Sequence, residues 1–297
     1  MQIPKSLKEG DHVAIVATAR KISSEEMNSA ITLLAHWGLV PVLGESIGLE
    51  KNQFAGSDQQ RAEDFQQQLD NDYIKAIWCA RGGYGTVRMV DLLNFSAFTQ
   101  NPKWIIGYSD VTVLHSHIHQ LKIATLHAPM PVDIMNATNK SVASLRDVLF
   151  GRSINYTIEN AKNNRPGSGK GALVGGNLSI LYALCGSVSA LETKDKILFI
   201  EDLDEYLYHI DRMMQNLKRN GMLVGLKGLI VGGMTKMHDN MIPFGKTAQE
   251  IILDAVQEYD YPVVFDFPAG HLQDNRALIL GAEVVLNVQN DTVLLAF

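Results

Sequence analysis

The chain is most informative at Pro102-Lys103-Trp104-Ile105-Ile106-Gly107-Tyr108-Ser109-Asp110. The apolar run at 104–106 is typical of a buried strand, and a segment with helical spacing follows at 111–120. A strand, a tight turn and a helix with a serine at the turn form a nucleophile elbow, which lifts the serine hydroxyl off the backbone. Ser109 is therefore a candidate nucleophile. The G-x-S-x-G pattern is incomplete, because Val111 replaces its second glycine, so a serine that merely caps the helix remains the alternative.

Apolar strands alternate with helical segments along the first half of the chain. Strands are predicted at 12–17, 39–43, 74–80 and 104–106, with helices at about 23–37 and 58–69 between the first three. Such alternation predicts a parallel sheet with right-handed crossovers, so we expect an α/β, Rossmann-like domain. The loops after 80 and 106 follow the carboxyl ends of strands, the edge at which open parallel sheets bind ligands.

The pattern changes after residue 149. The segment 160–171 is rich in turn-forming residues and poor in apolar ones, which is typical of a linker. We therefore predict an N-terminal α/β domain at 1–159, a linker at 160–171, and a smaller mixed α/β domain at 172–297. The last stretch, 282–297, alternates like a hairpin around Gln289-Asn290-Asp291.

A glycine-rich loop, Arg81-Gly82-Gly83-Tyr84-Gly85, follows the third predicted strand. Its glycines can adopt conformations closed to other residues, so successive N–H groups can converge on an anion. Such donors could form an oxyanion hole. A sharp strand-to-helix turn is the alternative. A nucleotide-phosphate loop is disfavoured, because the G-x-G-x-x-G spacing and a Gly-Lys-Ser/Thr ending are absent.

Carboxylates follow the predicted strand at 196–200. Glu201 and Asp202 stand just past its end, where an acid can orient a catalytic base. A helix cap by Asp202 or Asp204 is the alternative, and Glu205 nearby leaves the assignment open on spacing alone.

Nine histidines are candidates for the base. His115, His117 and His119 alternate, but alternating residues of a helix do not share a face, so one metal ion could not bind all three. His127 lies near the predicted ligand-binding edge and is a candidate pocket wall. His271 follows a predicted strand, in a loop whose proline and glycine can hold an imidazole in one orientation; a surface histidine is the alternative.

Composition limits the function classes. At 297 residues and 46% hydrophobic content, the chain can bury a core without disulfides or metals. Its net charge of -6 and pI of about 5.8, without a basic patch, argue against nucleic-acid binding. Two cysteines in apolar surroundings, no signal-peptide pattern at 1–20 and no long apolar span argue for the cytoplasm and against a membrane partner.

Together these pieces resemble the LD-carboxypeptidase family of serine peptidases, which includes muramoyltetrapeptide carboxypeptidases and microcin-immunity peptidases. The resemblance covers nearly the whole chain, and the family's motifs occur in its order. They are Arg81-Gly82-Gly83-Tyr84-Gly85, Lys103-Trp104-Ile105-Ile106-Gly107-Tyr108-Ser109-Asp110, Leu173-Val174-Gly175-Gly176-Asn177-Leu178, Ile200-Glu201-Asp202 and Gly270-His271.

The resemblance implies roles for particular residues. Ser109 would be the nucleophile, His271 the base and Glu201 the acid that orients it, in a cleft between two domains. We expect the oxyanion hole to combine the backbone N–H of Asp110 with that of Gly83 or Gly85. Candidate substrate-binding residues are Arg81, Tyr84 and His127. For Arg81, which could pair with a terminal carboxylate, a salt bridge that supports the loop is the alternative.

The resemblance also implies a reaction and a setting. Family members cleave the amide bond between an L-centre and the terminal D-alanine of muropeptide tetrapeptides, in the cytoplasm, during peptidoglycan recycling. They need no metal or other cofactor, and a homodimer is expected.

Three rival functions remain open on sequence alone. A peptidase of the microcin-immunity type would use the same triad on a peptidyl-nucleotide or a related acyl amide. A non-catalytic α/β ligand-binding protein would keep the elbow for structure. A metal-dependent hydrolase built on the alternating histidines is disfavoured by their spacing.

Overall fold

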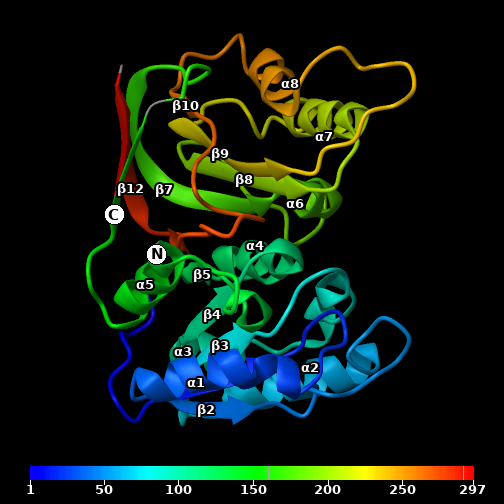
Figure 1. Ribbon diagram of the computed structural model, residues 1–297, viewed down its shortest axis with the longest axis vertical. Coiled ribbons are helices and arrows are strands. Elements are labelled where there is room, and N and C mark those ends of the chain that lie inside the picture. Colours follow the sequence, from blue (N-terminus) through cyan, green and yellow to red (C-terminus); the bar gives the residue numbers. More distant parts are fainter. Residues whose placement is uncertain (160, 290) are drawn as a thin grey trace.

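The structure is a computed structural model that describes residues 1–159, 161–289 and 291–297. Two β-sheets with their helices are stacked along the long axis of the molecule (Figure 1). The first half of the chain builds the lower sheet in this view, and most of the second half builds the upper one. This arrangement confirms the predicted α/β class, with a largely parallel N-terminal sheet and a second, mixed α/β domain.

The first sheet has the strand order β11-β5-β4-β3-β1-β2 and is parallel except for β11. Helices α1 and α5 pack on one face, and α2, α3 and α4 pack on the other. Burial between two helical layers explains the nearly continuous apolar runs of its central strands. The elements are β1 (His12–Val16), β2 (Val40–Leu43), β3 (Ile74–Cys79), β4 (Trp104–Gly107), β5 (Thr125–His127), β11 (Leu278–Leu280), α1 (Asn28–His36), α2 (Asp58–Asp70), α3 (Ser96–Gln100), α4 (Thr112–Gln120) and α5 (Asn139–Leu149).

The second sheet has the order β10-β9-β8-β7-β12-β13-β6, parallel from β10 to β7 and antiparallel beyond. Helices α6, α7 and α8 pack on one of its faces. The elements are β6 (Asn155–Glu159), β7 (Gly167–Asn177), β8 (Ile197–Leu203), β9 (Gly228–Thr235), β10 (Val263–Val264), β12 (Glu283–Val288), β13 (Thr292–Ala296), α6 (Leu178–Leu184), α7 (Leu207–Arg219) and α8 (Ala248–Ala255). Short 3-10 turns are η1 (Glu25–Met27), η2 (Thr86–Arg88), η3 (Val90–Leu92), η4 (Ser109–Val111) and η5 (Pro131–Asp133).

The last part of the expected linker at 160–171 is a strand, since β7 begins at Gly167; the first residue of the linker, Asn160, lies outside the described residues. The glycines in this part of the chain are needed because neighbouring backbone carbonyls approach them closely. A Cβ on Gly169 would lie 1.7 Å from the Lys227 carbonyl oxygen, and one on Gly171 would lie 2.7 Å from that of Asp195. Glycine inside a strand marks such a contact, which composition alone cannot distinguish from a linker.

The two sheets also exchange strands across the domain boundary predicted at residue 159. Strand β6 precedes that boundary but forms an edge of the second sheet, and β11 comes from the C-terminal half but pairs with β5 in the first. The predicted C-terminal hairpin is present as the antiparallel pair β12 and β13, although Asn290 in its turn lies outside the described residues.

The carboxyl edge of the first sheet meets the second domain at helix α4 (Figure 1). Here the Asn177 N–H, at the end of β7, donates to Thr112 Oγ1 at 3.0 Å. A Cβ on Gly176 would lie 2.5 Å from the same oxygen, so only glycine allows this approach. The junction therefore places the ends of β7 and β8 beside the turn that follows β4.

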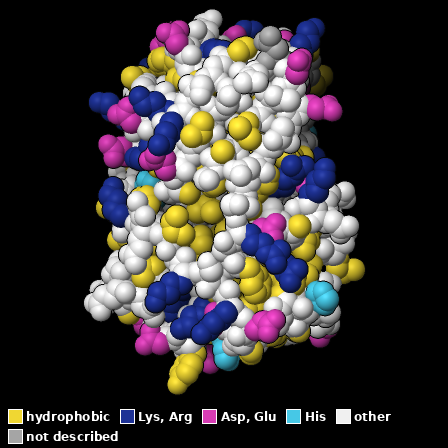
Figure 2. Space-filling model, turned by 90° about the vertical axis from the view of Figure 1, so that its left-hand side faces the viewer, with side chains coloured by type: hydrophobic (Ala, Val, Ile, Leu, Met, Phe, Trp, Pro, Cys, Tyr) yellow, Lys and Arg dark blue, Asp and Glu magenta, His cyan; other side chains and the backbone are white. Residues whose placement is uncertain are grey.

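The surface carries charges of both signs, as expected from the composition. On the face seen in Figure 2, Lys and Arg side chains are interspersed with Asp and Glu, and hydrophobic side chains gather near the middle. Among the helices of the described residues, none is both long enough and apolar enough to cross a bilayer.

Candidate active site

Ser109 stands at the turn between β4 and α4. Its backbone has φ +61°, in the left-handed region that side chains other than glycine rarely occupy. Gly107 has φ +157°, and a Cβ there would lie 2.9 Å from Val111 Cγ2, so the turn needs glycine at that position. The strand, turn and helix of a nucleophile elbow are thus present, although Val111 replaces the second glycine.

His271 bridges Ser109 and Glu201. Its Nε2 lies 3.1 Å from Ser109 Oγ, and its Nδ1 lies 2.6 Å from Glu201 Oε2. The His271 backbone N–H also donates to Glu201 Oε2, at 3.2 Å. A hydroxyl, an imidazole and a carboxylate from three separate elements therefore form one hydrogen-bonded relay, the arrangement that activates a serine.

Glu201 is held rigidly at the end of β8. It is fully buried, and its Oε1 accepts a hydrogen bond from Asn177 Nδ2 at 3.3 Å. Gly270 has φ +102°, and a Cβ there would lie 2.7 Å from the Glu201 side chain. Glycine therefore lets the His271 loop pass directly over the carboxylate. The loop is fixed further by the Gly270 N–H, which donates to Asn275 Oδ1 at 2.8 Å.

The structure separates Glu201 from the neighbouring acids that the sequence left as alternatives. Asp202 accepts hydrogen bonds from the Ser179 N–H and from Asn177 Nδ2, so it caps the start of α6. Asp204 and Glu205 pair with His238 and His209, at 2.5 and 2.6 Å. Of these acids, Glu201 is the one that contacts His271.

The charges around His271 favour its protonated form. Burial lowers its pKa, but the charge and hydrogen bond of Glu201, together with the charges of Asp202 and Asp133, outweigh burial, so the pKa of His271 is raised. Burial, together with the charge of Glu201, also raises the pKa of Asp202 to about 7. The imidazole is thus prepared to accept a proton from Ser109.

The glycine loop lies against the elbow. A Cβ on Gly82 would lie 3.1 Å from Ser109 Cβ and 3.4 Å from the Asp110 nitrogen. The loop is tied there because the Thr86 N–H donates to Asp110 Oδ2 at 2.8 Å. Gly83 lines the pocket in front of Ser109. Gly85 instead packs against Ala19 and Phe54.

The three predicted substrate-binding residues lie in different surroundings. Arg81 lines the pocket, but it donates to the Lys21 carbonyl at 3.3 Å and lies 4.0 Å from Glu26. Tyr84 is 44% exposed and packs near Phe54, away from the pocket lining.

His127 requires a correction, because it is not a pocket wall. It is fully buried, with its ring centroid 5.7 Å from that of Tyr108 and 4.9 Å from that of Phe199. Position near a sheet edge did not reveal that aromatic side chains from both domains close over this imidazole.

Two of the alternating histidines, His115 and His117, bind different partners. His115 bonds to Thr125 Oγ1 and to the Gly107 carbonyl, and His117 bonds to Ser189 Oγ. His115 therefore supports the elbow from behind. Within the described residues, no three His, Cys, Asp or Glu side chains converge as metal ligands.

The pocket in front of Ser109 has a volume of about 430 Å³ and lies between the two domains. His271, Tyr108 and Asp133 line both this pocket and a neighbouring one of about 480 Å³. Arg20, in the loop after β1, lines the first pocket and was missed by the sequence analysis. The signal for it was its place at the carboxyl end of a predicted strand, the same edge as Ser109.

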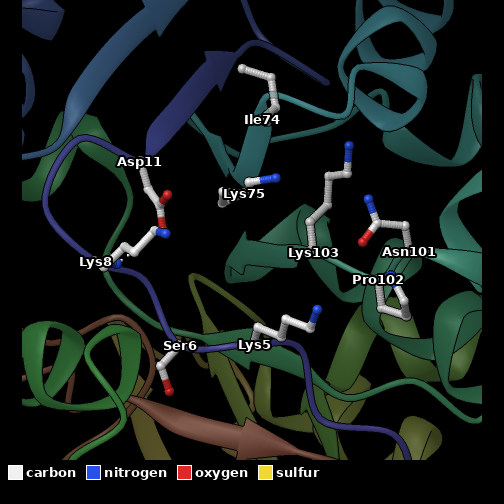
Figure 3. Close-up of a pocket in the computed structure, with 9 residues that line it drawn as sticks. All are labelled: Lys5, Ser6, Lys8, Asp11, Ile74, Lys75, Asn101, Pro102 and Lys103. Carbon is white, nitrogen blue, oxygen red and sulfur yellow. Dashed lines mark hydrogen bonds between the residues drawn. The ribbon is translucent and has the colours of Figure 1, made fainter.

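A separate pocket of about 360 Å³ lies at the opposite, amino-terminal ends of β1, β3 and β4 (Figure 3). Lysines dominate its lining, among them Lys5, Lys75 and Lys103. Lys103 Nζ donates to the carbonyls of Gln68 and Asn71 at 2.9 and 2.8 Å, so this ammonium caps the carboxyl end of α2. The pocket therefore lies at the opposite edge of the sheet from the Ser109 relay.

Family comparisons agree with the geometry. Residues 13–128 match the model of the LD-carboxypeptidase N-terminal domain, and residues 170–286 match that of the LD-carboxypeptidase C-terminal domain. The chain belongs to the LD-carboxypeptidase family. It is accordingly a hydrolase of the serine peptidase type, as the sequence motifs predicted.

Individual relatives match this family member over nearly its whole length. The "Probable murein peptide carboxypeptidase" of Bacillus subtilis is 32% identical, over 98% of this chain and 93% of the relative. The crystal structure of muramoyltetrapeptide carboxypeptidase from Oxalobacter formigenes has a TM-score of 0.87 at 23% identity, covering 96% of this chain and 97% of that one. The structure of MccF with glutamyl sulfamoyl guanosine has the same TM-score at 22% identity, covering 99% and 98%. Both solved structures share the fold.

Proposed function

We propose that this protein is a serine LD-carboxypeptidase that removes the terminal D-alanine from muropeptide tetrapeptides. The observation that carries the proposal is the relay from Ser109 Oγ through His271 to Glu201, with distances of 3.1 and 2.6 Å. The name of the Bacillus subtilis relative, a murein peptide carboxypeptidase, supports the substrate class. From the resemblance of its motifs to the LD-carboxypeptidase family, we also propose that it acts as a homodimer in the cytoplasm during peptidoglycan recycling.

Ser109 Oγ attacks the scissile carbonyl carbon while its proton passes to His271 Nε2. Glu201 holds the imidazole in the required tautomer and stabilises the imidazolium that forms. The negative charge on the carbonyl oxygen is bound by the N–H groups of Asp110 and Gly83. Gly83 is preferred to Gly85 because it lines the pocket. Losing one such donor typically lowers turnover about 100- to 1,000-fold.

The attack forms a tetrahedral intermediate, and its collapse breaks the scissile C–N bond. The amine of D-alanine leaves with the proton that His271 returns, and the remaining peptide is an ester of Ser109. Water then attacks the ester, with His271 again as the base, and regenerates the free hydroxyl. Every proton transfer uses the same nitrogen, His271 Nε2, which already faces Ser109 Oγ.

The test is release of D-alanine from a purified muropeptide tetrapeptide. A pentapeptide that ends in two D-alanines is the matched control, because its last bond joins two D-centres and we expect no cleavage. Ser109→Ala and His271→Ala should lower turnover at least about 1,000-fold while leaving the circular dichroism spectrum intact. Near-normal hydrolysis by Ser109→Ala would refute the serine mechanism.

The MccF structure contains an aminoacyl sulfamoyl nucleoside, which makes that substrate class the competing candidate. The same assay should therefore include an aminoacyl sulfamoyl adenosine. Cleavage of this compound without release of D-alanine would favour the microcin-immunity activity.

A further inference from the structure

The pocket in front of Ser109 is lined by charges of both signs. Arg20 and Arg81, in the loops after β1 and β3, line it from the N-terminal domain. The acids that line it are Asp110 and Asp133 of the N-terminal domain, and Asp202, Asp204 and Glu205 at the end of β8. A free carboxylate next to the scissile bond is therefore attracted by the two arginines and repelled by the acids, so it should bind beside an arginine.

The two arginines differ in how their charge is already used. Arg81 donates to the Lys21 carbonyl and lies 4.0 Å from Glu26. Within residues 1–159, 161–289 and 291–297, Arg20 has no carboxylate within ion-pair distance, and its side chain donates no hydrogen bond. Arg20 is thus the guanidinium with donors still available to a ligand.

The glycine loop provides the space for Arg20. A Cβ on Gly83 would lie 2.6 Å from Arg20 Cδ and 2.7 Å from its Nε. Any larger residue at position 83 would push the arginine away, so Gly83 lets the Arg20 side chain lie across the loop that borders Ser109. This contact gives Gly83 a packing role in addition to its backbone N–H.

Asp110 is the acid whose pKa Arg20 affects. Burial raises the pKa of Asp110, while hydrogen bonds from Thr86 and the charges of Arg61 and Arg20 lower it. Asp110 Oδ2 is already bonded to the Thr86 N–H, and Asp110 is only 1% exposed. Support of Asp110 is therefore the structural alternative for Arg20, and a test must separate it from ligand binding.

We propose that Arg20 binds the terminal carboxylate of the residue that leaves. This inference rests on the proposed carboxypeptidase function. The carboxylate of a leaving D-alanine lies one residue from the scissile carbonyl, so its partner must share the pocket with Ser109 Oγ, as Arg20 does. A guanidinium can bind a carboxylate with two parallel hydrogen bonds, which gives both strength and direction. Asp202, Asp204 and Glu205 would repel the same carboxylate if the substrate bound with that end toward β8.

The test compares a tetrapeptide with the same peptide whose D-alanine ends in a carboxamide. We expect wild-type kcat/KM to be about 10- to 100-fold higher for the free acid, the range expected for a charged hydrogen bond. Arg20→Ala should reduce kcat/KM for the free acid to the value for the carboxamide, and should leave kcat/KM for the carboxamide unchanged. Arg20→Lys should keep part of the preference, because lysine retains the charge without the planar fork. Arg81→Ala, at the matched arginine, should lower kcat/KM for both peptides by the same factor.

Binding to Ser109→Ala, measured by calorimetry, gives a readout that does not depend on turnover. The acid should bind more tightly than the amide, and Arg20→Ala in this background should abolish the difference. Equal binding of both peptides, binding of neither, or an unchanged preference without Arg20 overturns the inference. If Arg20→Ala lowers kcat/KM equally for both peptides, Arg20 acts by supporting Asp110, and this result also overturns the inference.

The two proposals fail in different ways. Tight, Arg20-dependent binding of the acid without release of D-alanine would refute the proposed function and leave the carboxylate site standing. Release of D-alanine with no acid preference would refute the carboxylate site alone.

Discussion

The backbone of Ser109 is held in a conformation that costs free energy, at φ +61°. Such a conformation persists only where the surroundings hold it, and here Val111 packs against Gly107 on one side while Gly82 lies against Ser109 on the other. The position of Ser109 Oγ relative to His271 therefore depends on small residues whose own side chains do no chemistry.

A methyl group at position 82 tests this dependence. In Gly82→Ala the new Cβ would lie 3.1 Å from Ser109 Cβ and 3.2 Å from its Oγ, so the serine must shift away from His271. We expect kcat to fall about 10- to 100-fold with little loss of unfolding free energy. Gly245→Ala is the control: it has φ +84° with no atom nearby, so it should lose about 1 kcal/mol of stability but no activity. Normal turnover in Gly82→Ala would contradict the account.

The pH dependence of activity follows from the raised pKa of His271. Below its pKa the imidazole is protonated and cannot take the proton of Ser109, so the acid limb of kcat/KM should lie above the usual histidine value of about 6.5. Glu201→Gln removes the charge that raises this pKa. The limb should move to lower pH, and the plateau should fall about 1,000- to 10,000-fold.

A pH series of kcat/KM on both proteins measures these effects. An acid limb at the same pH in wild type and Glu201→Gln would show that Glu201 does not set the ionisation of His271.

At the residue scale, the sequence identified the members of the relay but not their supports. Ser109, Glu201 and His271 were named before the structure because they lie in motifs that resemble those of the family; their local patterns alone left alternatives open. Arg20 and the burial of His127 depend on how two domains close on each other. Spacing alone left the choice among Glu201, Asp202 and Asp204 open, because all three lie at or just past the end of β8; the family resemblance pointed to Glu201, and the contact with His271 agrees with it.

At the scale of elements, α4 connects the nucleophile to the domain that carries its base. The helix starts three residues after Ser109, and the Asn177 N–H of β7 donates to Thr112 Oγ1 in its first turn. Asn177 in turn donates to Glu201. One chain of hydrogen bonds thus runs from the start of α4 to the acid of the relay.

Thr112→Val removes the acceptor at this junction without changing the shape of the side chain. The buried Asn177 N–H loses its partner, so we expect about 1–3 kcal/mol lower unfolding free energy and a lower kcat. Thr112→Ser keeps the hydroxyl and should preserve kcat. Urea unfolding together with steady-state kinetics measures both quantities. If Thr112→Val kept full activity, this hydrogen bond would not be needed to align the relay.

Element boundaries were predictable where side-chain periodicity determines them. The strands β1 to β4 and the helices α1, α2 and α4 follow the predicted apolar patterns closely, whereas the short β5, β11 and α3 and the helix α5 were not predicted. Strand β7 escaped prediction because its glycines are selected by neighbouring carbonyls, such as that of Phe199, which a Cβ on Gly175 would approach to 1.8 Å. A pattern of hydrophobicity carries no information about such contacts.

At the scale of the whole molecule, the two domains share one hydrophobic core. A single cluster of buried side chains contains Trp78 and Trp104 from the first sheet together with Phe199 and Leu295 from the second. Strand β11 adds a direct link, since this C-terminal segment pairs with β5 in the N-terminal sheet. The relay lies where these two halves meet, so its geometry depends on their staying together.

This shared core predicts that the two domains unfold as one unit. The tryptophans, Trp37, Trp78 and Trp104, are all buried in the N-terminal half, so their fluorescence reports on that half, whereas far-ultraviolet circular dichroism reports on the whole chain. The two urea transitions should coincide. Leu278 of β11 is fully buried, so Leu278→Ala should lower the unfolding free energy by about 2–5 kcal/mol and shift both midpoints equally. Leu294→Ala, at a 37% exposed site on β13, should have a much smaller effect. Fluorescence and circular dichroism midpoints that separate in the wild type, or a Leu278→Ala shift in only one of them, would mean that the domains unfold independently and that the relay is assembled by docking.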